Sequence, residues 1–462
     1  MKIMNLKKND ILELEITDIT NLGFGVAKYE GEVIFISDTV PGDRATVKII
    51  KVCSSYAIGK AEKLIKVSAL RTSDRCDSRI CLSCAYKNIH YKSECELKRE
   101  LVAQAFKKCG IDIEVADLIS SPATRAYRNK AQYPISRDKN GHYAIGFYAP
   151  KSHRVTEAAS CLLAPKVFAE ILEQLRLFFK KHNISTYDEL TASGLLRHIY
   201  LRRGEISGEI LLTIVINGRS LPHSDELVSS LTEKFPEIVG ILLNVNKAQT
   251  NIILGEEYIT LFGRNYIIDT LAGVDLKITA PSFYQVNHDC AELLYKKARE
   301  LAAPSKDDLL LDLYCGAGSI GLSMARDAKE VIGIEIVDSA VECAKYNASL
   351  NGIVNASFYT GDAADTEKLL QNAEHIRGEK ILPDIVILDP PRGGSDEKLL
   401  SHIASLAPRK IVYISCNPTT LARDMVILKD HGYTADEVTP VDMFPGTGHV
   451  ESVVCLTRRL DN

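Results

Sequence analysis

The sequence of 462 residues has no run of 18 or more apolar residues, so nothing in it is typical of a membrane-spanning helix. Its start, MKIMNLKKNDILELEI, lacks the apolar core and cleavage site of a secretory signal. It also lacks an excess of positive charge, since the net charge is −4. This disfavours general adhesion to nucleic acid but leaves room for a local basic groove. We therefore expect a cytoplasmic protein of two to four domains, with no evident obligate protein partner.

Cysteine is plentiful by contrast, with 12 residues. In a reducing compartment such residues rarely form disulfides, so we expect metal ligands or catalytic groups among them. Cys76, Cys81 and Cys84 have the spacing C-x4-C-x2-C, and Cys161 follows far downstream. Four thiolates suit zinc and an iron–sulfur cluster equally well. Most of the others are expected to be packed residues, namely Cys53, Cys95, Cys109, Cys290, Cys343 and Cys455.

Three regions follow one another along the chain. Residues 1–66 alternate between apolar and polar positions with glycine turns, which predicts a small β-barrel of the OB type, although another small β domain fits too. Residues 67–275 predict a central α+β domain with the cysteine cluster. A helix within 93–115 is a candidate to pack against the C-terminal domain. Residues 276–462 alternate strand and helix patterns, which predicts an α/β fold with a parallel sheet.

The loop LYCGAGSIG carries Gly316, Gly318 and Gly321 between a predicted strand and helix, and Glu335 ends the next strand. Glycines there let a ligand approach the backbone, and the carboxylate can accept ribose hydroxyl groups. Both a nicotinamide dinucleotide and S-adenosylmethionine fit this pattern.

The later strand ends favour the second cofactor. Asp362 follows the third strand, and Asp389 opens DPPRGG after the fourth, as in the motif IV region of class I methyltransferases. Cys416 ends the fifth strand, in YISCNP. A buried structural cysteine is the ordinary explanation, but ligands of such folds bind at these strand ends.

Several motifs together resemble the RNA uracil-5-methyltransferase family, which contains tRNA and bacterial 23S rRNA enzymes. They are SFYQVN (282–287), LDLYCGAGSIGL (311–322), DIVILDPPRGG (384–394), YISCNPTTLARD (413–424), FPGTGHVESV (445–454) and the cysteine segment (81–100). The resemblance implies a class I Rossmann-like domain and an N-terminal TRAM domain. It also implies a [4Fe–4S] cluster held by Cys76, Cys81, Cys84 and Cys161, rather than zinc or the catalytic cluster of a radical enzyme.

The resemblance further implies that Cys416 is the nucleophile and Glu451 the general base. It assigns contacts with S-adenosylmethionine to Gln285, Tyr314, Gly316, Gly318, Ser319, Glu335, Asp362 and Asp389. The chain departs from the family in having Gly446 and Gly448 where bulkier residues are common, and Ser319 where asparagine is common.

The chemistry explains these residue types. Uracil carbon 5 is a poor nucleophile until a thiolate adds to carbon 6, and a base must afterwards remove the hydrogen from carbon 5. We expect the helix that begins at Pro418 to lower the pKa of the Cys416 thiol. Without the resemblance, Glu451 also fits a surface carboxylate on an edge strand.

An RNA substrate is expected, with 23S rRNA favoured and tRNA as the alternative. The stretches 124–133 and 197–204 interleave Arg, Lys and Tyr and are candidates for RNA contacts or ordinary charged edge strands. Two other functions remain possible: a dehydrogenase on the same fold, and an RNA-binding protein with a degenerate catalytic site.

Overall fold

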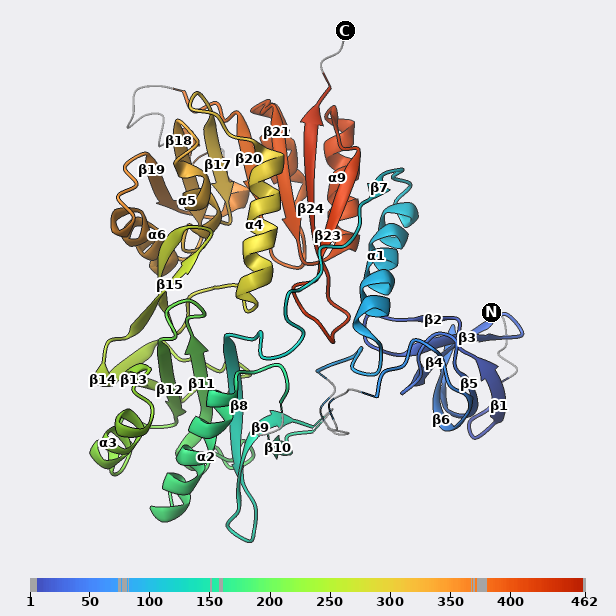
Figure 1. Ribbon diagram of the computed structural model, residues 1–462, viewed down its shortest axis with the longest axis vertical. Helices are drawn as coiled ribbons and strands as arrows, with labels where there is room; N and C mark the ends of the chain where they lie inside the picture. Colours follow the sequence, from blue (N-terminus) through green and yellow to red (C-terminus); the bar gives the residue numbers. More distant parts are fainter. Residues whose placement is uncertain are drawn as a thin grey trace.

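The computed structural model (Figure 1) describes most of the chain. The described residues are 6–459 without 74–75, 77–80, 82, 150–151, 158–160, 367, 369 and 372–379. An N-terminal lobe, a central lobe and a C-terminal lobe are visible, each built around its own sheet.

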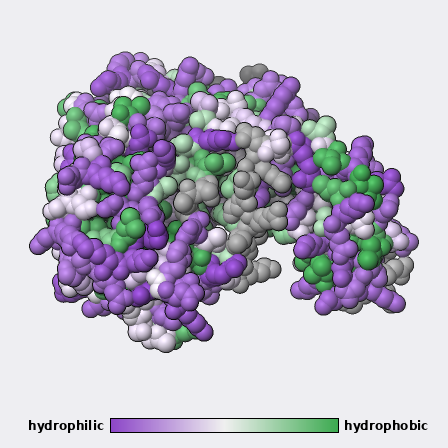
Figure 2. Space-filling model, turned by 60° about the horizontal axis from the view of Figure 1, so that its bottom comes forward, coloured by the Kyte–Doolittle hydropathy of each residue, from purple (hydrophilic) through white to green (hydrophobic). Residues whose placement is uncertain are grey.

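The N-terminal lobe is a curled six-stranded sheet in the order β1-β5-β6-β4-β3-β2. Its strands are β1 (Ile11–Glu15), β2 (Asp18–Ile19), β3 (Gly25–Tyr29), β4 (Glu32–Ser37), β5 (Arg44–Val52) and β6 (Tyr56–Lys66). Alternate side chains point inward, among them Ile34, Ile36 and Val47, and these form a separate core. In Figure 2 this lobe lies at the right, and its lower edge stands apart from the main body.

The central lobe is a seven-stranded sheet in the order β10-β9-β8-β11-β12-β13-β14. Its strands are β8 (Lys130–Arg137), β9 (Tyr143–Tyr148), β10 (Val155–Glu157), β11 (Leu196–Arg203), β12 (Ile210–Ile216), β13 (Ile238–Val245) and β14 (Glu257–Gly263). Helices α2 (Lys166–Lys181) and α3 (Ser224–Lys234) pack on one face. The other face joins the C-terminal core through a hairpin of β15 (Tyr266–Leu271) and β16 (Val274–Thr279).

The C-terminal lobe contains five parallel strands in the order β19-β18-β17-β20-β21, continued by β24, β23 and β7, with β22 also paired to β24. The parallel strands are β17 (Leu309–Leu313), β18 (Glu330–Glu335), β19 (Ala356–Thr360), β20 (Ile385–Leu388) and β21 (Lys410–Ser415). The remaining strands are β7 (Glu114–Val115), β22 (Tyr433–Thr434), β23 (Glu437–Val441) and β24 (Glu451–Arg458). Because strand order reverses between β17 and β20, this is the edge where such folds bind ligands.

Helices cover both faces of this sheet. They are α1 (Tyr91–Lys108), α4 (His288–Ala302), α5 (Ser319–Ala325), α6 (Asp338–Leu350), α8 (Glu397–Ser405) and α9 (Pro418–Asp430), with a short η1 (Ala363–Asp365) after β19. Leu310 faces the core that contains α4, α5 and α6, whereas Leu311 and Leu313 face the core that contains α1, α8 and α9. This two-sided burial explains why the strands are apolar throughout.

The expected α/β architecture is confirmed, with one correction in the helix predicted within 93–115. Helix α1 ends at Lys108, and Gly110 follows with φ +70°. The chain then extends into β7, which pairs in parallel with β23. Both α1 and β7 thus precede the central lobe in sequence but pack on the C-terminal sheet (Figure 1). Within the part of the chain that the structure describes, every helix is too short or too polar to cross a membrane.

Candidate functional site

The residues expected at strand ends share one edge of the C-terminal sheet. Tyr314 follows β17, Glu335 ends β18, Asp362 comes two residues after β19, Asp389 follows β20 and Cys416 follows β21. Because the five strands are parallel, their carboxyl ends lie at the same edge of the sheet, in the spatial order β19-β18-β17-β20-β21. The topology therefore brings together groups that are far apart in sequence.

The glycine loop has the backbone that its sequence requires. Gly316 and Gly318 have φ +54° and φ +81°, which side chains with a Cβ rarely adopt. A Cβ on Gly318 would also lie 3.1 Å from the Phe358 ring. Tyr314 has φ +63° without being a glycine, so the backbone beside this loop is strained.

Glu335 is oriented by backbone groups. Its two carboxylate oxygens accept hydrogen bonds from the N–H groups of Gly316 (3.1 Å) and Val337 (2.9 Å). Asp362 is exposed at the neighbouring strand end, and so are Ile336 and Val337, at 60% and 50%. An apolar surface beside two carboxylates suits a nucleoside, whose flat base and ribose hydroxyls need both.

Gln285 and Ser319 lie on either side of this edge. Gln285 is buried, and its backbone carbonyl accepts a hydrogen bond from the Asn129 side chain at 2.8 Å. Ser319 begins α5, and its hydroxyl lies 2.9 Å from the Tyr295 hydroxyl. Burial raises the pKa of Tyr295, and the Asp389 and Glu451 charges add to the rise, so this residue of α4 lies near the strand-end carboxylates.

Acidic side chains crowd the centre of the edge. Burial raises the pKa of Asp389 to about 7. Burial also raises the pKa of Asp312 to about 7, with Asp389 and Glu335 adding to the effect and the N–H of Gly321 opposing it. Asp312 is fully buried and accepts that N–H at 2.9 Å. The charges of Asp389 and Glu335 act on Asp312, so a cation bound beside these carboxylates would reduce their mutual repulsion.

Cys416 is half-buried between β21 and the start of α9. Burial raises the pKa of its thiol, Glu451 and Asp389 add to the rise, and Arg392 opposes it. The expected lowering by the helix is therefore wrong. Asn417 caps α9 by accepting the N–H of Thr419 at 3.1 Å, so the amide nearest the helix start already has a partner.

Glu451 is the first residue of β24 and is buried. Burial and the Asp389 carboxylate raise its pKa to about 8, while Arg392 opposes the rise. Strand β24 runs antiparallel to β21 with Ser452 opposite Ser415. Glu451 therefore belongs to an inner strand of the sheet, which excludes the surface-carboxylate alternative.

Sequence analysis assigned no role to Arg392 or Asp312. Arg392 is the cation that lowers the pKa of both Cys416 and Glu451. It lies in DPPRGG, beside the Asp389 that was singled out, so the motif contained the signal. The burial of Asp312 could only be known once β17 was placed inside the sheet.

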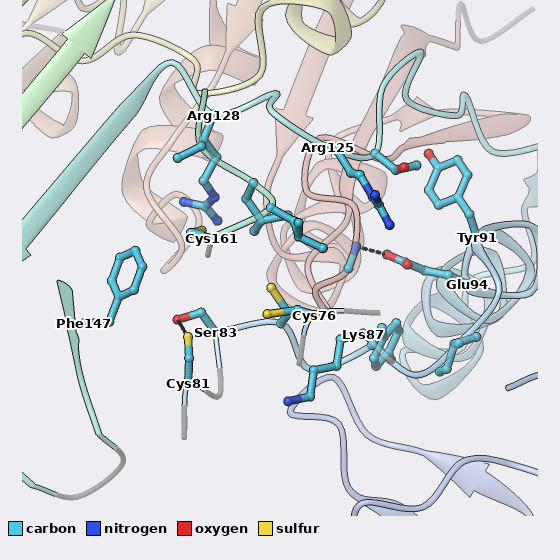
Figure 3. Close-up of a pocket in the computed structure, with 18 of the residues that line it drawn as sticks. Cys76, Cys81, Ser83, Lys87, Tyr91, Glu94, Arg125, Arg128, Phe147 and Cys161 are labelled. Atoms are coloured by element: carbon cyan, nitrogen blue, oxygen red, sulfur yellow. Dashed lines mark hydrogen bonds between the residues drawn. The ribbon is translucent and has the colours of Figure 1, made fainter. Parts of the chain in front are cut away.

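A cavity of about 700 Å³ lies between the N-terminal half of α1 and the central lobe. Cys76, Cys81, Cys84 and Cys161 all line it. Burial raises the pKa of Cys84 to about 12, and the other three thiols add to the rise. Figure 3 shows Cys76, Cys81 and Cys161 around this cavity, with Arg128 above them. The structure thus gathers the four cysteines that the sequence grouped.

Other cysteines are less buried than expected. Cys290 and Cys315 are buried, whereas Cys53, Cys95, Cys109, Cys343 and Cys455 are only partly buried. A further group of metal-ligand types, formed by His182, His223 and Glu226, lies on the surface of the central lobe. Lys181 already neutralises Glu226 through an ion pair of 2.5 Å, so we interpret this group as surface ion pairing.

The basic stretch 197–204 does not form a charged edge strand. It belongs to β11, which lies between β8 and β12. Arg197 donates to the carbonyls of Asn246 and Ala248, and Arg202 donates to those of Ala280 and Ser282. These guanidinium groups therefore support the fold. In the stretch 124–133, Arg125, Arg128 and Lys130 line the cysteine cavity.

Comparison with known proteins identifies two family matches. Residues 90–459 match the family described as tRNA (Uracil-5-)-methyltransferase. Residues 6–61 match the TRAM domain. The two matches include most of the N-terminal sheet, Cys161 and the whole C-terminal site, whereas Cys76, Cys81 and Cys84 lie between them and belong to neither match.

Similar proteins extend over nearly the whole chain. A protein of Clostridium tetani named an uncharacterized RNA methyltransferase is 39% identical, over 99% of this chain and 98% of its own length. A similarly named protein of Listeria monocytogenes is 39% identical, over 99% of both chains. A solved structure of the Pyrococcus abyssi tRNA (uracil-54, C5)-methyltransferase with S-adenosyl-L-homocysteine is 27% identical with TM-score 0.77. The match includes 96% of this chain and 100% of that one.

Proposed function

The chain belongs to the tRNA (uracil-5-)-methyltransferase family, and from that premise we propose that it methylates carbon 5 of a uridine in RNA through a covalent bond to Cys416. The observation that carries the proposal is the pairing of β21 with β24. It sets a thiol and a carboxylate on adjacent strands beside the strand ends that suit a nucleoside.

S-adenosylmethionine fits the acidic strand edge better than a nicotinamide dinucleotide does. Burial raises the pKa of Asp312, Asp389 and Glu451, and the Asp389 charge adds to the rise at the other two, so these buried carboxylates repel one another. The sulfonium and ammonium groups of S-adenosylmethionine would stabilise these carboxylates, whereas a pyrophosphate would be repelled. This cofactor supplies a methyl group bound to a positively charged sulfur. Glu335, Asp362, Asp389, Gln285, Tyr314, Ser319 and the glycine loop would hold it.

The residues of this chain would then act in sequence. The Cys416 thiolate forms a bond to uracil carbon 6, and the electron pair of the 5,6 double bond moves toward carbon 5 and the carbonyl at carbon 4. Carbon 5 would then bond to the methyl carbon as the bond from that carbon to the sulfonium sulfur breaks, which would leave the sulfur neutral, as in S-adenosylhomocysteine. The Glu451 carboxylate removes the proton from carbon 5, the pair reforms the double bond, and the bond between carbon 6 and the sulfur breaks. Cys416 leaves as a thiolate, ready for another substrate.

The order of these steps gives the raised pKa of Glu451 a function. Glu451 must be ionised when it removes the proton, and its pKa of about 8 makes it a stronger base than an exposed carboxylate. Arg392 lowers the pKa of both groups and would stabilise the thiolate before the uracil arrives. We assign it that role.

The four cysteines would hold a [4Fe–4S] cluster. Sulfur atoms around zinc lie about 3.8 Å apart, given a zinc–sulfur distance of about 2.3 Å. Within the described residues, no three of the four sulfurs lie within 4.8 Å of one another. A [4Fe–4S] cluster is larger than a single ion and takes four thiolates, so it fits the wider spacing of these sulfurs. Since Cys416 does not line the cavity that the four cysteines share, we assign the cluster a structural role.

The favoured substrate is 23S rRNA, because the cysteine segment and the N-terminal domain together resemble the rRNA branch of the family. The second candidate is tRNA, which is the substrate in the name of the Pyrococcus abyssi enzyme. In either case the target base has to be unstacked, since a thiol cannot reach carbon 6 inside a helix.

The direct test uses purified protein, methyl-labelled S-adenosylmethionine and unmodified rRNA or tRNA, followed by mapping of the labelled nucleotide. We expect 5-methyluridine in rRNA. An RNA with 5-fluorouridine at the mapped position should remain bound to the peptide that contains Cys416. Label on another atom, or a trapped peptide without Cys416, would contradict the proposal.

A further inference from the structure

The segment that leads into Glu451 has no regular secondary structure, yet it is largely buried. It consists of residues 442–450, DMFPGTGHV, between the end of β23 and the start of β24, and we refer to it as the base strap. Asp442 and Met443 are fully buried at one end of the strap, and Val450 is 3% exposed at the other. The position of the strap affects the position of Glu451, because Glu451 directly follows it as the first residue of β24.

One side chain of α1 holds the first part of the base strap. The Lys98 ammonium donates to Asp442 Oδ1 at 2.6 Å and to the Phe444 carbonyl at 3.1 Å. Its third bond goes to Glu94 Oε1, also at 2.6 Å. Lys98 and Asp442 are fully buried. All three donors of the ammonium therefore have a partner in a place that excludes water.

Glu94 extends this contact to the middle of the strap. Its Oε1 accepts the N–H of Gly446 at 2.7 Å, and the dashed line that ends on Glu94 in Figure 3 marks this bond. Gly446 has φ +80°, a conformation that glycine adopts without strain. Helix α1 therefore contacts the strap at positions 442, 444 and 446. No other described element binds it at so many points.

Neighbouring segments complete the enclosure. The Tyr127 hydroxyl donates to the Pro445 carbonyl at 3.0 Å, and the N–H of Tyr86 donates to the Gly446 carbonyl at 2.9 Å. A Cβ on Gly448 would lie 1.9 Å from the carbonyl oxygen of Asn21 in the N-terminal lobe. The positive φ of Gly446 and the close approach of Asn21 to Gly448 explain why glycine occupies these two positions.

We propose that Lys98, together with Glu94, is a positioning residue that fixes Glu451 for proton removal from carbon 5. The inference rests on the proposed role of Glu451 as the base. Lys98 acts through the strap, since Asp442 and Phe444 come before Glu451 in the chain and the strap is tied to α1 up to Gly446. Cys416 directly follows β21, and no described hydrogen bond joins it to α1 or to the strap, so we expect it to keep its place when the strap shifts.

This difference predicts a specific kinetic defect. Loss of the Lys98 contacts should slow proton removal, which follows methyl transfer, and leave bond formation by Cys416 intact. The RNA would then be methylated but would remain attached to the protein. Displacement of a catalytic group by about 1 Å can slow a step by about 100-fold.

The experiment compares Lys98→Met and Glu94→Gln with Glu96→Gln, a matched change on the exposed face of the same helix. It measures turnover, methyl transfer in a single turnover with excess enzyme, and the protein–RNA adduct that survives denaturing electrophoresis. Because Lys98→Met leaves buried carboxylates without their cation, its thermal midpoint is measured too, and Glu94→Gln provides a variant with a milder effect on folding.

We expect Lys98→Met to lower turnover by about 10-fold to 100-fold and to accumulate adduct, with single-turnover methyl transfer within about two-fold of the unsubstituted protein. Glu94→Gln should show the same pattern more weakly, and Glu96→Gln should show none of it. If the adduct stays at its original level in both variants, or if methyl transfer falls in parallel with turnover, the positioning role is wrong. If Glu451→Gln itself accumulates no adduct, the assumed role of Glu451 fails, and the inference fails with it.

Discussion

Cys416 and Glu451 both lie next to the last residue pair that joins β21 to β24. Ser415 lies opposite Ser452 in the antiparallel pairing of β21 with β24, so the next residue of β21 is Cys416 and the preceding residue of β24 is Glu451. The Glu451 carboxylate also acts on the Cys416 thiol, whose pKa it raises. The strand pairing therefore brings the thiol and the carboxylate to the same end of two neighbouring strands.

The first prediction follows from this relationship. Glu451→Gln should retain addition of Cys416 to uracil and methyl transfer, but proton removal should slow by about 100-fold to 10,000-fold, because a general base contributes on that scale. Denaturing electrophoresis should show a methyl-labelled protein–RNA adduct. The matched variant Cys416→Ala should show neither label transfer nor adduct. Free methylated RNA at the normal rate from Glu451→Gln would rule out this carboxylate as the base.

The second prediction concerns pH. The reaction needs Cys416 as a thiolate and Glu451 as a carboxylate, and both pKa values are raised, that of Glu451 to about 8. Turnover should therefore increase as pH rises from 6 through 8. Arg392→Gln removes the cation that lowers both pKa values, so the increase should move to higher pH by roughly half a unit to one unit. Arg392→Lys keeps the charge and should leave the profile in place. An identical profile for Arg392→Gln would contradict the role of this guanidinium.

The third prediction uses two ligands that differ by one charge. Asp389 lies at the acidic centre of the strand edge, where its charge acts on Asp312 and Glu451, so a cation would stabilise all three carboxylates. Asp389→Asn should weaken binding of S-adenosylmethionine by about 5-fold to 30-fold, and binding of S-adenosylhomocysteine, which has no sulfonium, by less. Calorimetry with both ligands measures the difference. An equal loss for the two would show that Asp389 does not face the sulfonium.

The fourth prediction separates the cluster from zinc. Protein purified without oxygen should contain about four iron atoms and show a brown absorbance, as expected for a [4Fe–4S] cluster. Cys84→Ser should lose most of the iron and most of the absorbance, because Cys84 lies near the other three thiols, whose charges raise its pKa. Cys95→Ser is the matched control, since Cys95 lies in α1 and does not line the cavity. Stoichiometric zinc in place of iron would overturn the assignment.

The pattern of apolar and polar residues in the sequence was sufficient to predict the parallel sheet and the row of residues at its strand ends. Alternation of apolar strands with helices depends on local pattern, and Cys416 and Asp389 were identifiable because each directly follows a strand. The buried lysine was not identifiable in this way. Glu94 and Lys98 are four residues apart on a helix, a spacing typical of an exposed ion pair. Their burial depends on Asp442, which is 344 residues from Lys98 in the chain.

The pKa of Cys416 shows the same limit. A helix that starts next to a thiol suggests a lowered pKa, but the outcome depends on carboxylates that come from other strands and on Asn417, which caps the helix. The basic stretch 197–204 was misjudged for a related reason. Arg197 and Arg202 bind carbonyl groups from segments that the sequence gives no means of placing beside them.

The location of β7 and α1 has a consequence for how the protein is made. Glu114 pairs with Glu437, and Lys98 with Asp442, so the first part of the C-terminal lobe is synthesised more than 300 residues before its partners. Helix α1 leaves the ribosome with an apolar face and with a lysine that has only Glu94 of the same helix as a partner. The N-terminal and central lobes can fold during synthesis, as separate domains generally do. The last strands must emerge before α1 can dock, so assembly of the catalytic lobe is completed only when translation is nearly finished.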